Sequence, residues 1–176
     1  MVFYPFSFEG DISLHDVGKK KVLTYKVLFM PEAFETRLPF DEYPRLRIEG
    51  EIAEVSVRGA WMPVGDGRRY FIVSPEIKKQ TGFGVGDRVE MRFRIDDQDY
   101  VDIPSELEKA LSRTPSIMEL WTTLTPGKQR MFAHHIAAAK TAPTRARRVS
   151  ESLEAIGLGI SLRDLNNARK KDKRPT

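Results

Sequence analysis

The chain has 176 residues, with 29 Lys and Arg against 25 Asp and Glu, and it contains no cysteine. This length can bury a hydrophobic core without metal or disulfide support, and the lack of cysteine excludes disulfides, thiolate zinc sites, iron–sulfur clusters and cysteine nucleophiles. No apolar run approaches the roughly 18 residues that span a membrane, and the N-terminus lacks the features of a secretory signal, so we expect a cytoplasmic protein with no membrane span.

The charge is distributed unevenly along the chain. Residues 1–103 carry 15 basic and 18 acidic side chains, a net charge of −3, whereas residues 104–176 carry 14 basic and 7 acidic side chains, a net charge of +7. A change of sign of this size indicates two units with different surfaces. We therefore expect a first domain over 1–99, a helical tail over 100–168 and a disordered basic end over 169–176, where no apolar residue follows Ala168.

Short segments rich in β-branched and aromatic residues predict strands in the first domain. They lie at 25–29, 45–52, 54–58, 69–73 and 88–95. The last segment alternates strictly, as a half-buried strand does, and its apolar residues share one face: Val89, Met91, Phe93 and Ile95. Residues 63–67 include Asp66-Gly67 and predict a tight hairpin turn, because such a turn needs backbone conformations that glycine adopts easily.

This β-region contains an internal repeat. An apolar strand ending in Pro-Glu occurs at 25–32 and again at 69–76, and an alternating strand begins 12 or 13 residues later, at Arg88 and at Arg45. Each copy has the order strand, helical turn, loop, strand. The proline begins the helical turn, because proline suits the first position of a helix. One copy alone would expose its apolar face, so we expect the two copies to close on each other into a small barrel.

From residue 103 the apolar spacing becomes helical. We expect helices at 104–111, from Thr114-Pro115, from Thr125-Pro126 to a stop before Pro143, and at 145–156, with each threonine as a cap. The last of these would turn four residues inward: Ala146, Val149, Leu153 and Ile156. Gly157 would be its left-handed stop, and Ser161 with Asp164 resembles a capping box for a final short helix.

Two stretches resemble known families. Residues 73–89 contain Ser-Pro-Glu-Ile, Thr-Gly and Val-Gly-Asp-Arg-Val, and resemble the swapped-hairpin unit of AbrB/MazE-type proteins. The tail carries Leu-Trp-Thr-Thr-Leu-Thr-Pro-Gly at 120–127, Ala-Ala-Ala-Lys at 137–140 and Thr-Arg-Ala-Arg-Arg-Val at 144–149, and is similar to the YdeI/OmpD-associated, bacteriocin-protection family. The resemblances imply an α+β fold: a pseudo-duplicated double-split β-barrel, a domain of unknown function, followed by a C-terminal helical tail.

The bacteriocin-protection family implies tolerance to bacteriocins or antimicrobial peptides and carries no established catalytic residues. We therefore expect a non-enzymatic bacterial binding protein linked to such tolerance or to stress, with no cofactor. A barrel closed by duplication does not need a second chain, so we expect a monomer. Two alternatives stay open: an AbrB-like regulator that binds nucleic acid, and an enzyme or sensor that holds a small molecule in the barrel mouth.

The strongest candidate site is a basic cluster in the tail, made of Lys140, Arg145, Arg147 and Arg148. Arginine forks match phosphate and carboxylate groups, so the cluster is a candidate for an anionic ligand or nucleic acid. Cations at a helix start oppose the helix dipole, which favours a second interpretation: the cluster docks the tail on the acidic first domain, and Arg147 pairs with Glu151.

The barrel mouth supplies a second candidate site, made of Trp61, Arg68, Arg69 and Tyr70, although a hairpin and core packing explain the same residues. Other chemistry finds no support. Residues 82–87 precede a strand, so they predict a turn and not a nucleotide loop. The aspartates of 96–102 lack the spacing of a calcium loop. His134 and His135 are adjacent and cannot share a metal, and His15 lies in an expected loop without a nucleophile motif.

Overall fold

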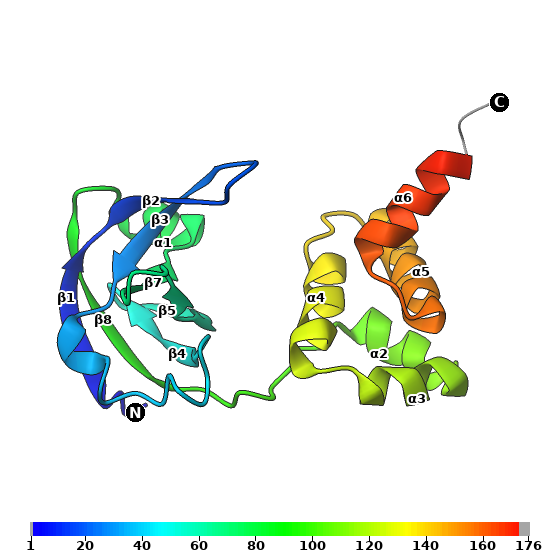
Figure 1. The fold of residues 1–176 in the computed structure, drawn as a ribbon, viewed down its shortest axis with the longest axis horizontal. Helices are drawn as coiled ribbons and strands as arrows, with labels where there is room; N and C mark the ends of the chain where they lie inside the picture. The colour runs from blue at the N-terminus through cyan, green and yellow to red at the C-terminus, as the bar shows by residue number, and fades with distance from the viewer. Residues whose placement is uncertain (1, 173–176) are drawn as a thin grey trace. The chain divides into compact units, whose positions relative to one another are not determined.

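A computed structural model describes residues 2–172 and divides the chain into two compact units, Met1–Gln98 and Asp99–Thr176 (Figure 1). The first unit contains two four-stranded antiparallel sheets and the second contains five α-helices, α2 to α6. The α+β class is therefore confirmed. No closed barrel is detected within residues 2–172.

Each sheet is built from both halves of the first unit (Figure 1). The first sheet has the order β1 (Phe6–Asp11), β8 (Arg88–Ile95), β4 (Arg47–Ile52) and β5 (Val55–Ala60). The second sheet has the order β2 (Ser13–Val17), β3 (Leu23–Phe29), β7 (Arg69–Ile72) and β6 (Met62–Pro63). The chain passes from the first sheet to the second at Ile12 and again at Trp61, and both of these residues are buried.

Both copies of the predicted repeat are present. Pro31 is followed by the 3₁₀ helix η1 (Glu32–Phe34), and Pro75 opens the α-helix α1 (Pro75–Thr81). Helix α1 ends at Gly82, whose φ of 81° is in the left-handed region that favours glycine. Each turn lies between two strands, β3 and β4 in the first copy and β7 and β8 in the second. The predicted order of elements is confirmed for both copies.

The two copies pair with each other and not within themselves. Strand β3 pairs with β7, and β4 pairs with β8, both antiparallel. In the β4–β8 pair Gly50 of the first copy faces Phe93 of the second. A residue that precedes this central pair in one copy faces the residue that follows it by the same number of positions in the other copy, as a local two-fold axis requires. Gly50 is needed at this crossing, because a Cβ atom there would lie 2.1 Å from the carbonyl oxygen of Arg92.

The core of the first unit lies between the two sheets. Its largest fully buried side chains include Trp61, Phe93, Leu28, Ile48 and Met91. The predicted alternation of β8 is confirmed for Val89, Met91 and Phe93, whereas Ile95, at the end of the strand, is 41 % exposed.

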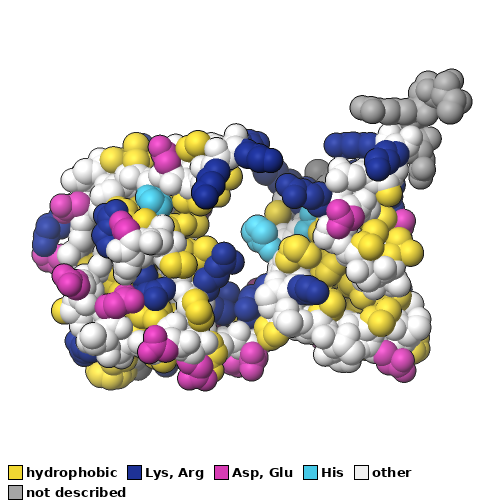
Figure 2. Space-filling view, viewed as in Figure 1, with side chains coloured by type: hydrophobic (Ala, Val, Ile, Leu, Met, Phe, Trp, Pro, Cys, Tyr) yellow, Lys and Arg dark blue, Asp and Glu magenta, His cyan; other side chains and the backbone are white. Residues whose placement is uncertain are grey.

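The other side of the first sheet carries a network of ion pairs, which we call the charged face. It is made of Glu9, Asp11, Glu49, Glu51, Arg58, Arg88, Glu90, Arg92 and Arg94. The bond from Arg58 Nε to Asp96 Oδ2, at 2.8 Å, extends this network to a buried carboxylate. Basic and acidic side chains alternate over β1 and β8 in Figure 2. Each arginine of the charged face thus has an acidic partner beside it.

Sequence reasoning missed strands β1 and β2. His15 is wrongly placed in a loop, because it lies in β2 opposite Tyr25 of β3. The predicted hairpin turn at 63–67 is confirmed: the Val64 amide donates to the Arg68 carbonyl, and Gly65 and Gly67 have positive φ.

The helical unit has its own core. Its helices are α2 (Ser105–Ser112), α3 (Pro115–Thr123), α4 (Pro126–Ala137), α5 (Ala142–Leu158) and α6 (Leu162–Asp172). Its buried residues include Leu107, Leu111, Trp121, Phe132, Ile136 and Ile156. Thr125 caps α4 as predicted. Thr114 occupies the predicted N-cap position of α3, but its hydroxyl donates to the Ala110 carbonyl and makes no capping hydrogen bond. Ser161 caps α6 by accepting from the Asp164 amide at 3.1 Å.

Four expectations about the last two helices are wrong. Helix α5 begins at Ala142 and not at Arg145, because the Thr141 side chain accepts from the Thr144 amide. It ends at Gly159, with φ 65°, so Gly157 is helical, and Ala146 is exposed. Residues 169–172 belong to α6 and are not a disordered end, whereas residues 173–176 lie outside the described part.

Candidate functional site

The early start of α5 changes the position of the basic cluster. Thr141 is the cap, so Arg145, Arg147 and Arg148 fall beyond the first helical residues. The helix dipole acts mainly within the first turn, and its repulsion of these cations is correspondingly small. The cluster therefore has to be understood from its contacts and not from its distance to the helix start.

Two of the four cluster residues donate hydrogen bonds to backbone carbonyls of the helical unit. Arg145 donates from Nη2 to the Ala139 carbonyl at 3.0 Å and from Nη1 to Glu106 Oε1 at 3.0 Å. Arg148 donates from Nη1 to the His135 carbonyl at 2.6 Å. The last carbonyls of a helix have no intrahelical partner, so these two arginines satisfy the end of α4 and join it to α5.

The pair between Arg145 and Glu106 affects the titration of the carboxyl. Backbone hydrogen bonding at the start of α2 and the Arg145 guanidinium lower the pKa of Glu106 below its ordinary value of 4.5. Both effects favour the charged carboxylate. The acidic partner of Arg145 thus comes from α2, within the same unit.

The other two cluster residues point toward solvent. Lys140 is exposed, and the Arg147 side chain is 66 % exposed with a guanidinium nitrogen 3.8 Å from Glu151, the predicted pair. Glu151 is buried and also faces His135 Nε2 at 3.5 Å and Arg169 at 3.3 Å. The structure therefore divides the predicted cluster into two structural arginines and two outward cations.

The barrel-mouth candidates are not gathered around one opening. Trp61 is in the core, and Tyr70 is buried on the other side of the second sheet. Arg69 donates to the Pro44 carbonyl and to Glu35, and Arg68 is exposed beside Asp66. Sequence adjacency placed these residues together, but alternation along β7 sends Arg69 and Tyr70 to opposite faces.

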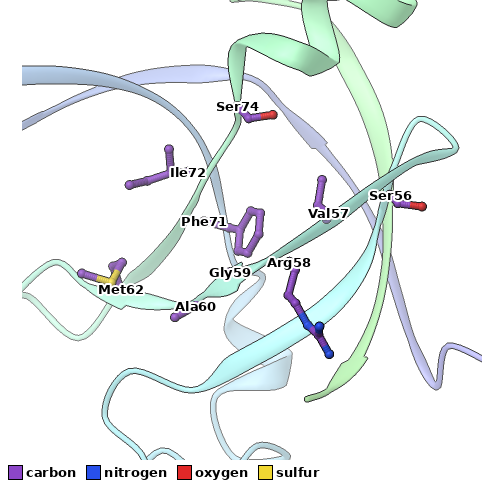
Figure 3. A pocket seen from close by; sticks show the side chains of 9 residues that line it. All are labelled: Ser56, Val57, Arg58, Gly59, Ala60, Met62, Phe71, Ile72 and Ser74. Carbon is purple, nitrogen blue, oxygen red and sulfur yellow. The ribbon is translucent and has the colours of Figure 1, made fainter. Parts of the chain in front are cut away.

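A groove that sequence reasoning missed lies between β5 and β7 (Figure 3). It has a volume of about 400 Å³ and is lined by Ser56, Val57, Arg58, Gly59, Ala60, Met62, Phe71, Ile72 and Ser74. The Phe71 ring lies against Gly59, where a Cβ atom would be 2.9 Å from the ring. Strand β5 is the edge of the first sheet, so the groove runs beside backbone groups that no neighbouring strand pairs within the described residues.

Within residues 2–172, no group of three or more His, Asp or Glu side chains is arranged to hold a metal ion. No helix in this part of the chain is long and apolar enough to cross a membrane.

These observations define the second unit as a compact helical domain that is held together in part by its own arginines. Residues 100–159, from just before α2 to the end of α5, match the family described as bacteriocin-protection, YdeI or OmpD-associated. The match covers about a third of the chain, and the predicted resemblance of the tail to this family is confirmed over these residues. No curated protein matches the chain. The resemblance of the first unit to AbrB/MazE-type units stays a prediction.

Proposed function

We propose that the chain is a non-enzymatic binding protein of the bacteriocin-protection type. The observation that carries this proposal is the family match over 100–159. Bacteriocins are peptides or proteins, so the class of partner that this family implies is a polypeptide. The cytoplasmic location and the monomeric state are parts of the same proposal.

The β5–β7 groove is the place in the first unit that best fits a polypeptide. An extended segment that added to the free edge of β5 would gain main-chain hydrogen bonds, and its side chains would meet the apolar floor formed by Val57, Ala60 and Phe71. Gly59 keeps this floor open beside the Phe71 ring. The groove supplies edge hydrogen bonding and apolar contact together.

We also propose that the first unit is a pseudo-duplicated double-split barrel. Its support is the reciprocal pairing of the two copies, β3 with β7 and β4 with β8, about the central pair Gly50 and Phe93. The two strand crossings between sheets, at Ile12 and Trp61, are the corners that a barrel of this kind needs.

The two alternative functions gain less support. A nucleic-acid regulator would use the basic cluster, but Arg145 and Arg148 donate to carbonyls of the helical unit. A small-molecule enzyme would use the barrel mouth, but its four candidate residues lie on different faces. Neither arrangement favours the alternative over a polypeptide-binding protein.

The test is survival of bacteria that express the chain when they are challenged with a panel of bacteriocins. We expect higher survival than with an empty vector, loss of the effect in Val57→Asn, and no loss in Val55→Asn. Val57 lines the groove, whereas Val55, two residues earlier on β5, does not. Circular dichroism would show that both variants are folded.

Unchanged survival with the wild-type chain would overturn the proposed function. Equal survival with the two variants would remove the groove from it. Cleaved or modified bacteriocin, detected by mass spectrometry after incubation with the purified chain, would overturn the non-enzymatic part.

A further inference from the structure

The outer side of the second sheet carries aromatic and apolar side chains, and we call it the aromatic face. It includes His15, Leu23, Tyr25, Phe29, Tyr70 and Ile72, which the strand register places on one side of β2, β3 and β7. Their neighbours along the strands, Leu28 and Phe71, point to the core. The second sheet therefore carries apolar side chains on both faces, the face toward the core and the face away from it.

The rings of the aromatic face pack on one another. His15 lies 4.6 Å from Tyr70 and 5.7 Å from Phe29, measured between ring centroids. Tyr70 is only 4 % exposed, and its burial raises the pKa of its hydroxyl. The Arg68 guanidinium lies 5.0 Å from the Phe29 ring centroid. The centre of the face is thus a packed aromatic layer with a cation at its margin.

The hairpin that joins β2 to β3 extends this face and ends in three consecutive lysines. Lys19, Lys20 and Lys21 are all exposed, and none has an acidic partner among the described residues. Val22 beside them is 56 % exposed and Leu23 is 46 % exposed. Figure 2 shows basic side chains at this tip. The hairpin combines unpaired positive charge with exposed aliphatic surface.

The hairpin has almost no opposing charge. Asp16 is its single acidic residue between Ser13 and Phe29, and it accepts a hydrogen bond from Thr24 at 2.5 Å. Both Asp16 and Thr24 alternate with the residues of the aromatic face and lie on the other side of the sheet. A partner that contacts the lysines and the aliphatic residues therefore meets no carboxylate on the same side of the hairpin.

We propose that the lysine tip and the adjacent aromatic face dock on a membrane surface rich in anionic lipids. Lysines near such a surface are attracted to its negative potential, and aliphatic side chains gain by leaving water at the headgroup boundary. Tyr25, next to Leu23 on this face, is the type of residue that the membrane–water interface favours. This proposal does not rest on the proposed function, because the lysines and the exposed aliphatic residues that carry it belong to the β2–β3 hairpin and not to the groove.

The same observations fit a single-stranded nucleic acid less well. Bases stack on accessible ring faces, but Tyr70 is buried and the Phe29 ring is occupied by Arg68. The side chains with the largest exposure at the tip are aliphatic, and stacking does not use them. A lipid surface uses both the lysines and the aliphatic residues.

The first test is cosedimentation of the full chain with phosphatidylcholine vesicles, with and without phosphatidylglycerol. We expect binding only to vesicles with the anionic lipid, and a loss of at least about 100-fold in the partition coefficient for Lys19→Glu/Lys20→Glu/Lys21→Glu. The matched control makes the same charge change at exposed lysines elsewhere, Lys78→Glu/Lys109→Glu/Lys128→Glu, and should bind as the wild type does.

The second test places a reporter on the hairpin. Tryptophan emission should shift to the blue when anionic vesicles are added to Leu23→Trp, because the ring leaves water. The wild-type tryptophans are buried, Trp61 at 0 % and Trp121 at 3 % exposure, so the change reports the new residue. Ser7→Trp, on the charged face, is the control and should not shift.

Absence of wild-type binding, equal binding to neutral vesicles, or equal loss in the two triple variants would each overturn the proposal. Binding of a labelled single-stranded oligonucleotide that is lost in the hairpin variant, with no vesicle binding, would assign the face to nucleic acid instead. Thermal unfolding of each variant would show that the fold is retained, and a negative result would then count against the docking surface itself.

Discussion

The outer faces of the two sheets differ sharply, although each sheet contains one strand from each copy of the repeat. On the charged face, carboxylates and arginines lie side by side, as in the pair of Arg92 with Glu51 at 2.5 Å. On the aromatic face, rings pack on rings, and Lys19, Lys20 and Lys21 at its end have no acidic partner within the described residues. One face satisfies its charges internally, and the other leaves both charge and apolar surface available.

This difference separates residues that hold the fold from residues that are free to bind. Exposed ion pairs contribute little to stability individually, but a face made of them attracts neither an apolar nor a charged partner strongly. Contiguous apolar surface with unpaired charge is typical of an interaction site. The variants below test whether each face has the role that its composition indicates.

The largest expected effect is at Asp96, the buried carboxylate to which the network of the charged face extends. The Asp96 side chain is 3 % exposed and accepts two hydrogen bonds from Arg58, at 2.8 and 2.9 Å. Asp96→Ala removes both of these charged hydrogen bonds, and we expect a loss of about 3 kcal/mol in the free energy of unfolding. Urea denaturation of the full chain measures it.

Glu9→Ala is the matched control on the same face. Glu9 pairs with Arg88 at 3.2 Å, but its side chain is 66 % exposed. We expect a change within about 0.5 kcal/mol. Equal losses in the two variants would mean that burial does not distinguish the pairs of this face.

The helical unit allows the same comparison between two adjacent arginines. Arg148 donates to the His135 carbonyl at 2.6 Å, whereas the Arg147 side chain is 66 % exposed. We expect Arg148→Met to destabilise the chain by about 2 kcal/mol, because a charged donor leaves a helix-end carbonyl. Arg147→Met should change little, and thermal unfolding would show the difference. A reversed order would restore Arg148 as a ligand candidate.

The β4–β5 and β2–β3 hairpin turns each contain a residue with positive φ, but the residue is glycine only in the second. The β4–β5 turn places Glu54, which is not glycine, at a φ of 67°, whereas the β2–β3 turn has Gly18 at 109°. Glu54→Gly should stabilise the chain by about 1 kcal/mol, because glycine adopts positive φ without strain. Gly18→Ala should destabilise it, since its Cβ would lie 2.3 Å from the Lys21 carbonyl oxygen. Denaturation midpoints that move in the same direction would contradict this account.

The smallest expected effect is a pH dependence at the margin of the aromatic face. The Arg68 side chain and amide donate to Asp66 and lower the pKa of its carboxyl below the ordinary 3.8. The folded-state pKa is depressed, so the contribution to stability is present above pH 3.8 and is lost as the pH falls through the lower folded value. Titration by NMR should find this low pKa, and Arg68→Gln should return it toward 3.8.

The sequence predicted the parts of the fold that depend on local pattern. Strand β8 was placed at its observed bounds because its alternation is strict, and the repeat was visible because Pro-Glu follows an apolar strand twice. Strand β2 was missed because its alternation is unusual. Leu14 faces solvent at 58 % exposure, and His15 is the residue that packs.

The candidate site was harder to predict, because its contacts are distant in sequence. The basic cluster was identified correctly as a group of cations, but the Ala139 and His135 carbonyls that hold Arg145 and Arg148 belong to the end of another helix. The β5–β7 groove depends on Gly59 facing Phe71 across two sheets. No local pattern predicts either contact.

The reciprocal pairing of the two copies has a consequence for how the chain depends on its own concentration. Neither copy pairs its own two strands, since β3 pairs with β7 and β4 with β8. A single copy would need a second molecule to complete either sheet, and its folding would weaken on dilution. Joining both copies in one chain replaces that encounter by an intramolecular one at a fixed effective concentration. The first unit therefore keeps its stability however few molecules a cell contains.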